Sequence, residues 1–233
     1  MSDVEEIKRL LSLCNPAQRD EVFRQLRQEI SIHPLEQELH AKAEIILEAI
    51  RRAGGLTLRM IRGVIAEAAF GVEVVERLKN WQSIPVSGDP AYDFLLKDRK
   101  GVVRVQVKLQ RSKSGQPWPA YQARKAFRSL PPDMYIVETQ KTRGGKKKKT
   151  GTATRPYRFG KFDLLAVAMY PSTKRWDTFM YTVADWLIPD PIDQAVIFKY
   201  QPVASTANDD WTDSFQTAVK WLRSEEKKTI RAQ

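Results

Sequence analysis

Residues 92–108, YDFLLKDRKGVVRVQVK, constrain the fold of this chain more than any other stretch. Two runs rich in aromatic and β-branched residues flank the turn sequence DRKG at 98–101, which predicts a four-residue hairpin loop. The loop ends in a glycine, which can adopt a positive φ. We therefore expect an antiparallel hairpin in which Lys97 pairs with Val102.

That pairing determines which side chains share a face of the hairpin. Successive residues of a strand point to opposite faces, so Asp93 lies opposite Gln106, with Lys108 on the same face. The opposite face is expected to be apolar and to pack in the core. It carries Tyr92, Phe94, Leu96, Val103, Val105 and Val107.

The polar face of this hairpin is a candidate site. A carboxylate beside an amide oxygen can hold a hard divalent cation such as Mg²⁺, which prefers oxygen ligands and retains several waters. A lysine two residues further along the strand can meet a phosphate or orient a metal-bound water. Alternation alone favours the plainer alternative, an ordinary hairpin with one face in solvent.

The composition excludes several classes of protein. The chain of 233 residues is long enough for one domain with a real core. Two histidines and a single cysteine cannot build a usual zinc site or a disulfide framework. The sequence lacks a long apolar run and begins with charged residues, so we expect no membrane span, no signal peptide and a cytoplasmic location.

The net charge of +11 is concentrated in the middle of the chain. Residues 97–161 hold 19 Lys and Arg against three acidic residues, a charge of +16, which leaves −5 for the remainder. A basic region flanked by mildly acidic ends indicates a polyanionic partner, most commonly nucleic acid. Anionic membranes, or no partner at all, are the alternatives.

The chain organises around this basic middle. Residues 1–55 are expected to form an N-terminal helical arm, with Asn15 capping a helix that starts at Pro16 and a second helical stripe from 35 to 50. The arm would serve dimerisation or DNA gripping. Residues 56–224 form the expected core, with a basic hairpin insertion around 134–160, and residues 225–233 a frayed tail.

The core segments that follow the first hairpin are expected to be mainly strands. The apolar run 161–170 predicts a central buried strand, and Asp163 at its start is interpreted as a strand-end residue. Further strands are expected within 175–187 and 195–203. A closing helix is marked by Trp211, Phe215, Ala218 and Leu222.

Glu67 is an anomaly in the helix that follows Thr57. The helix LRMIRGVIAEAAFGVEVV is apolar around most of its circumference, so the carboxylate needs a partner. A salt bridge to an arginine is one reading. The other is that Glu67 points at the hairpin site, with Gly63 one turn earlier leaving room.

These residues together resemble the PD-(D/E)XK nuclease superfamily, in which a helix carries a Glu and a hairpin carries an Asp followed by an acid-x-Lys motif. The pattern maps onto Glu67, Asp93, Gln106 and Lys108. RGVIAE is similar to a helix of archaeal Holliday-junction resolvases, and VRVQVKLQRSKSG is similar to the Q-x-K form of Mrr-like restriction nucleases. Two departures are Tyr92 in place of the usual Pro, and Gln106 in place of the acid.

The resemblance implies a restriction-endonuclease-like fold, an α/β mixed sheet flanked by helices. It also implies Mg²⁺-dependent hydrolysis of double-stranded DNA by a type II restriction endonuclease acting as a homodimer, with no small-molecule cofactor. Asp93, Gln106 and Glu67 would be the metal ligands, and Lys108 would activate the attacking water.

Three other functions stay open. A DNA repair nuclease or Holliday-junction resolvase would use the same site on a different substrate. A non-catalytic nucleic-acid-binding module would carry a degenerate site, which Gln106 in place of an acid favours. A basic RNA-binding protein is the third.

Basic residues downstream of the hairpin are expected to contact DNA, partly through a lysine-tipped hairpin that acts as a clamp. A solvated turn is the alternative for the tip. The aromatics among them, Trp118 and Tyr121, suit either packing or DNA contact. The expected DNA-binding residues are Arg111, Lys113, Arg124, Lys125, Lys141, Arg143, Lys146, Lys147, Lys148, Lys149, Arg155 and Arg158.

Overall fold

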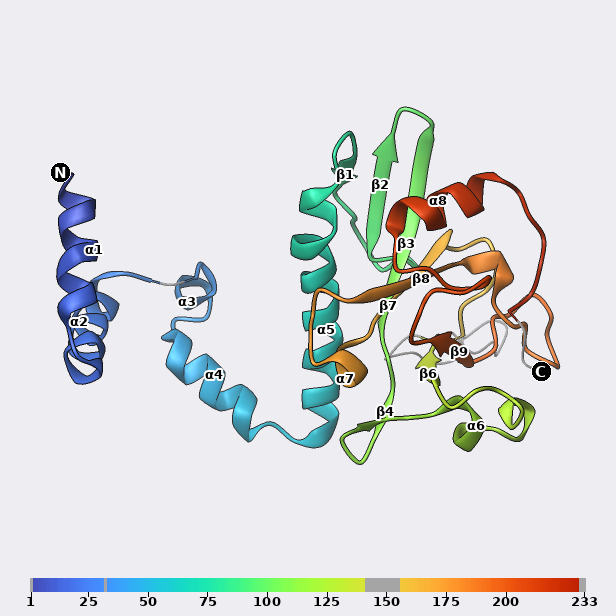
Figure 1. Ribbon diagram of the computed structural model, residues 1–233, viewed down its shortest axis with the longest axis horizontal. Helices are drawn as coiled ribbons and strands as arrows, with labels where there is room; N and C mark the ends of the chain where they lie inside the picture. Colours follow the sequence, from blue (N-terminus) through green and yellow to red (C-terminus); the bar gives the residue numbers. More distant parts are fainter. Residues whose placement is uncertain (1, 32, 141–155, 231–233) are drawn as a thin grey trace. The chain divides into compact units, whose positions relative to one another are not determined.

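The computed structural model describes residues 2–31, 33–140 and 156–230 (Figure 1). The chain divides into two compact units, Met1–Leu58 and Arg59–Gln233. The sequence placed this boundary between residues 55 and 56. Within the described residues, no helix combines the length and the apolar character needed to cross a membrane.

The first unit is helical. Asn15 caps its second helix as expected, in a reciprocal capping box with Gln18, and Pro16 occupies the first helical position. Of the described residues in this unit, Glu36 is the one that is buried. The helices are α1 (Asp3–Leu13), α2 (Pro16–Glu29), α3 (Leu35–Glu38) and α4 (Ala43–Arg52).

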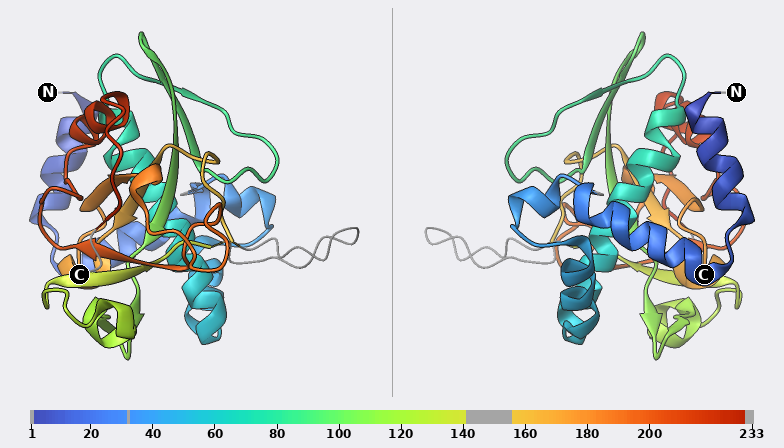
Figure 2. Two further views of the ribbon diagram at one scale, coloured as in Figure 1. Left: turned by 90° about the vertical axis from the view of Figure 1, so that its right-hand side faces the viewer. Right: turned by 90° about the vertical axis from the view of Figure 1, so that its left-hand side faces the viewer.

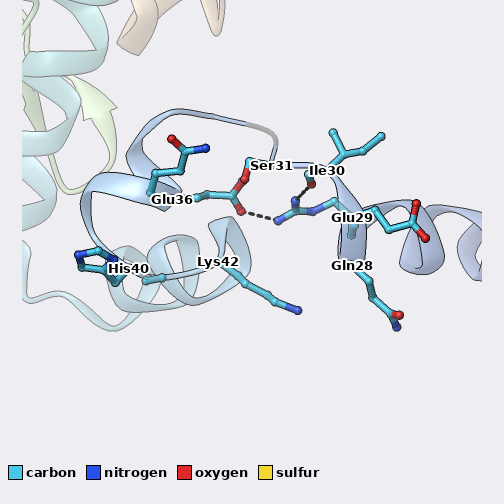
Figure 3. A pocket seen from close by; sticks show the side chains of 10 residues that line it. Gln28, Glu29, Ile30, Ser31, Glu36, His40 and Lys42 are labelled. Carbon is cyan, nitrogen blue, oxygen red and sulfur yellow. Dashed lines mark hydrogen bonds and ion pairs between the residues drawn. The ribbon is translucent and has the colours of Figure 1, made fainter.

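The helical stripe expected from 35 to 50 is broken into α3 and α4. His40 between them has a φ of 48°, a left-handed conformation that ends a helix. The buried Glu36 carboxylate accepts a hydrogen bond from the Ala43 amide at 2.6 Å. It also pairs with Arg27 at 2.5 Å (Figure 3). One side chain thus caps α4 and ties it to α2, an arrangement that a continuous helix would prevent.

The second unit is built on a mixed five-stranded sheet in the order β1-β2-β3-β7-β8. β3 and β7 are parallel and the other neighbours antiparallel. The expected central strand is confirmed, because all five residues of β7 are buried, which requires cover on both faces. The strands are β1 (Gln82–Ile84), β2 (Phe94–Asp98), β3 (Gly101–Leu109), β7 (Leu164–Ala168) and β8 (Phe179–Val183).

Helices α5 (Gly55–Glu73) and α8 (Phe215–Arg223) pack on this sheet (Figures 1 and 2). The ring of Phe70 on α5 lies 5.0 Å from that of Phe94 on β2, 5.4 Å from Phe179 on β8 and 6.4 Å from Phe215 on α8. A mixed sheet flanked by helices is therefore the architecture, as the sequence predicted. This aromatic contact places the Glu67 turn of α5 beside the start of β2.

Shorter elements complete the second unit, and β6 pairs antiparallel with β9 in a separate two-stranded sheet. Residues 112–117 form a tight hairpin with positive φ at Ser114 and Gly115. The shorter elements are η1 (Val75–Arg77), β4 (Ser112–Lys113), β5 (Gln116–Pro117), α6 (Ala120–Ala123), η2 (Lys125–Phe127), β6 (Met134–Glu138), α7 (Tyr170–Thr173), η3 (Ala184–Trp186) and β9 (Tyr200–Ala204).

The predicted register of the first hairpin is confirmed, with Lys97 opposite Val102 and Phe94 opposite Val105. Its turn is tighter than expected, because Asp98 and Gly101 still pair and leave Arg99-Lys100 as the loop. The Asp98 carboxylate stabilises this turn by accepting the Lys100 amide at 2.9 Å.

The C-terminal segment differs from the frayed tail expected for 225–233, as far as residue 230. Ile230 is buried and its amide donates to the Trp186 carbonyl at 2.7 Å. The Trp186 indole in turn donates to the Glu226 carbonyl at 2.8 Å. Ile230 is a single apolar residue in a polar tail, and the sequence pattern does not predict that it packs against the rest of the unit.

The hairpin core gives a direct test of the register. Val105→Asp places a charge at a fully buried position, at a cost of several kcal/mol that rivals the stability of a whole domain, so we expect the fold to be lost. Val102→Asp, on the same strand where the side chain is 54% exposed, should stay folded. Thermal unfolding followed by circular dichroism distinguishes them, and equal tolerance of both changes would contradict the register.

Candidate active site

A cavity of about 410 Å³ brings together three of the four predicted catalytic residues, Glu67, Asp93 and Lys108. They come from α5, the loop before β2, and β3. The predicted Gln106 does not line the cavity. The remaining lining residues are Arg59, Met60, Gly63, Val64, Asp89, Pro90 and Tyr157.

One stripe of α5 forms a wall of this cavity. Arg59, Gly63 and Glu67 are spaced four residues apart, so they lie above one another on one helix face. A Cβ atom built on Gly63 would meet nothing within 4 Å, so the space beside the helix is open. This agrees with the expectation that Gly63 leaves room next to Glu67.

The Asp93 carboxylate is fixed where the β2–β3 ladder ends. The ladder stops at Phe94, and the Asp93 amide donates to the Val105 carbonyl at 2.9 Å instead of completing a pair with Gln106. Oδ2 of Asp93 accepts the Val107 amide at 2.8 Å. The side chain thus supplies a hydrogen-bond acceptor to β3 where β2 no longer does.

Gln106 is buried and supports Asp93. Its side-chain nitrogen donates to Oδ2 of Asp93 at 2.5 Å and to the Val107 carbonyl at 3.0 Å. Both partners are acceptors, which assigns the nitrogen to this side of the amide. Among the described residues Oδ1 of Asp93 accepts no hydrogen bond, which leaves it for a ligand. Metal ligation by the Gln106 oxygen stays a prediction.

Glu67 and Asp93, two of the three carboxylates that line the cavity, are held in an unfavourable charge environment. Burial, and then the nearby charge of Asp93, raise the pKa of Glu67 to about 7, against a smaller opposing effect of Lys108. Burial also raises the pKa of Asp93, while Lys108 and the Val107 amide oppose that rise. One lysine therefore does not compensate two partly desolvated acids.

Tyr157 belongs to the site, although sequence reasoning placed it in the basic hairpin insertion. Its buried ring lies 5.4 Å from Nζ of Lys108 and packs edge-on against Phe162 at 5.6 Å. Burial raises the pKa of its hydroxyl, so the group stays protonated at neutral pH. Tyr157 is distant from β3 in the sequence, so no residue spacing predicts that it joins the site. Arg59 lies two four-residue steps before Glu67 on the same helix face, so the helical period could have predicted it.

The residues of the cavity fit a small, hard divalent cation. The available donors are carboxylate oxygens, which suit Mg²⁺ and not the softer metals. In the described part of the chain no three His, Cys, Asp or Glu side chains form a metal-binding group. A cation held by Glu67 and Asp93 would therefore keep several water ligands, and its charge would compensate the excess of acid.

The predicted DNA-binding residues that the structure describes lie on the second unit. Arg111 lies 3.4 Å from Glu138 and Arg158 lies 3.1 Å from Asp193. Lys113 and Arg124 lie over aromatic rings, and Lys125 is exposed in η2. The others, Lys141, Arg143, Lys146, Lys147, Lys148, Lys149 and Arg155, fall outside the described residues.

Comparison with solved structures gives a distant likeness. No protein-family model matches the chain, and no curated protein matches it. A solved structure described as that of a bacterial homing endonuclease, I-Ssp6803I, is similar with a TM-score of 0.41 and 16% identity, over 74% of this chain and 98% of that one. A likeness at this level supports no inference about activity.

The raised pKa of Glu67 predicts how stability varies with pH. Between its ordinary value of 4.5 and about 7, the folded state holds a proton that the unfolded state releases, so the unfolding free energy falls as pH rises. Glu67→Gln removes this dependence, a difference of about 1 kcal/mol after allowance for partial exposure. Chemical denaturation with EDTA from about pH 5 to about pH 8 measures it, and an unchanged slope would contradict the assignment.

The role of Gln106 predicts the effect of Gln106→Glu. Similar size alone would predict a neutral change, but a glutamate cannot donate to Asp93 or to the Val107 carbonyl. We expect a loss of roughly 3 kcal/mol at neutral pH without metal, because two carboxylates would then meet in a buried position. The exposed Gln116→Glu is the matched control, and equal stability of both variants in urea would exclude the supporting role.

Proposed function

We propose that this protein is a divalent-metal-dependent DNA endonuclease that hydrolyses phosphodiester bonds. The observation that carries the proposal is the meeting of Glu67, Asp93 and Lys108 around one open cavity, from three separate elements.

Glu67 and Asp93 would hold Mg²⁺, the latter through Oδ1. When bound, the cation would supply positive charge for the phosphate and lower the pKa of a water ligand. Lys108 would hold the attacking water or a phosphate oxygen beside the carboxylates, and its ammonium would offset the negative charge that develops on phosphorus. Tyr157, packed near the ammonium, would limit the positions that Lys108 can take.

Double-stranded DNA is the proposed substrate, and site-specific cleavage of the type II restriction kind is the proposed activity, in the cytoplasm. The concentration of positive charge between residues 97 and 161 supports a nucleic-acid substrate. Two strands of opposite polarity need two active sites, so we propose a homodimer. The resemblance to Q-x-K restriction nucleases supports the class.

One observation favours a different function, a non-catalytic DNA-binding module. The side-chain nitrogen of Gln106 donates to Asp93, and the motif position that is acidic in the superfamily pattern supplies no carboxylate in this chain. A Holliday-junction resolvase stays the rival among nucleases.

The test is incubation of purified protein with a plasmid of mixed sequence and Mg²⁺, followed by mapping of the fragment ends. Recurrent ends in one sequence support a restriction activity, and scattered ends or preference for a four-way junction support the rival nucleases. Absence of cleavage with both Mg²⁺ and Mn²⁺, while DNA binding persists, would support the non-catalytic module.

The proposed role of Lys108 separates chemistry from binding. Lys108→Ala should lower the cleavage rate by about two to three orders of magnitude, because the ammonium acts mainly on the transition state. Binding of DNA in Ca²⁺ should change little. Lys97→Ala, an exposed lysine of the same hairpin, is the matched control and should cleave normally. Wild-type cleavage by Lys108→Ala would exclude the site.

A further inference from the structure

A second cluster of functional side chains lies outside the cavity, where three segments join β6. The Arg111 amide donates to the Ile136 carbonyl at 2.7 Å, and the Trp118 amide donates to the Arg111 carbonyl at 3.0 Å. On the other side of β6, Glu138 pairs with Tyr200 of β9. This backbone frame places side chains from distant parts of the sequence together.

Glu138 is the acidic centre of that cluster. It lies 3.4 Å from Arg111 and 3.4 Å from Nζ of Lys199, and it accepts a short hydrogen bond from Gln140. The Arg111 Nε is buried yet makes no hydrogen bond with a described residue, so the pairing with Glu138 is through charge alone. The Glu138 carboxylate therefore pairs with both Arg111 and Lys199.

Two aromatic rings position further cations next to this centre. Tyr200 lies 4.6 Å from the Arg124 guanidinium and 4.8 Å from Nζ of Lys199, and its ring meets that of Trp118 at 6.2 Å. Lys113 in turn lies 5.6 Å from the Trp118 ring. Contacts of this kind restrict long side chains before any ligand arrives, which lowers the entropy cost of binding.

We name Arg111, Lys113, Arg124 and Lys199 the cation cluster. Two of its members, Arg111 and Lys199, pair with Glu138, while Lys113 and Arg124 are exposed and lie over aromatic rings. The sequence predicted three of the four as DNA contacts. Lys199 was missed because it joins the others through the long-range pairing of β6 with β9.

We propose that the cation cluster binds backbone phosphates of duplex DNA on one side of the bond cleaved at the cavity. The proposal rests on the proposed function and deepens it. Preorganised cations in excess over acid bind phosphates without reading bases, so the cluster positions the duplex and does not select its sequence.

The chain fixes how far this contact lies from the cavity. Arg111 follows Lys108 by three residues at the end of β3, and an extended chain covers about 3.3 Å per residue, so their Cα atoms are at most roughly 10 Å apart. One strand of duplex DNA rises 3.4 Å per nucleotide. A phosphate contacted by Arg111 would therefore lie only a few nucleotides from the cleaved bond.

Other polyanions could use the same chemistry, namely RNA or an anionic membrane. Duplex DNA is favoured because Arg111 follows the end of β3, the strand that carries Lys108, by two residues. A membrane would require apolar side chains for insertion beside the cations, whereas Trp118 and Tyr200 are packed against each other.

The test uses Lys113→Gln, Arg124→Gln and Lys199→Gln, singly and combined, in the full chain. Affinity for a short fluorescent duplex in Ca²⁺ is measured over a range of salt concentrations. Each lost phosphate contact should weaken binding several-fold and reduce the salt slope by roughly 0.9, and the combined variant by roughly three times that. Lys220→Gln, exposed on α8, is the matched control and should bind like the wild type.

Thermal unfolding confirms that each variant is folded, and Lys199→Arg should restore the slope if positive charge is what matters. Unchanged slopes in the three variants, while the wild type cleaves DNA, would overturn the cluster and leave the proposed function intact. Reduced slopes without cleavage by any protein would support the cluster and count against the proposed function. Loss of binding to single-stranded RNA or to phosphatidylserine vesicles, with duplex binding unchanged, would also overturn it.

Discussion

The position of the Asp93 carboxylate determines the geometry of the whole candidate site. Where β2 stops, Oδ2 of Asp93 accepts hydrogen bonds from the Val107 backbone amide and from the Gln106 side-chain nitrogen. These two bonds fix the carboxylate against β3. Lys108 is the next residue of that strand, so its position relative to Asp93 follows from the backbone. α5 then supplies Glu67, because the contact of Phe70 with Phe94 holds the helix beside the start of β2.

This arrangement has an electrostatic consequence. Burial raises the pKa values of Glu67 and Asp93, and Lys108 opposes the rise at both carboxylates. Holding the two acids in this state costs free energy, which the burial of the apolar core must offset. Groups held in such a state are more common at functional sites than in purely structural ion pairs. Elsewhere in the unit, the Arg104–Asp163 pair at 2.6 Å shows the ordinary alternative, an acid compensated by a guanidinium.

The sequence predicted the hairpin register because alternation leaves one placement for its apolar residues. It indicated Glu67 as a candidate site residue because a carboxylate in an apolar helix needs a partner. It could not predict which atom of Gln106 faces Asp93, since an amide is both donor and acceptor. It also missed Tyr157 and Lys199, which reach their positions through pairings distant in sequence. The sequence did not predict the helix break at His40, because the apolar stripe continues through that residue. The capping of α4 by Glu36 depends on tertiary structure, which the local pattern does not contain.

The central claim is that Glu67 and Asp93 form one divalent-cation site. Isothermal titration of Mn²⁺ into the protein tests it most directly, with Glu67→Gln and Asp93→Asn as the altered proteins and Asp133→Asn, an exposed acid elsewhere in the unit, as control. The account predicts saturable binding in the wild type and the control, and its weakening or loss in both site variants. Equal binding by all four proteins, or none by the wild type, would contradict it.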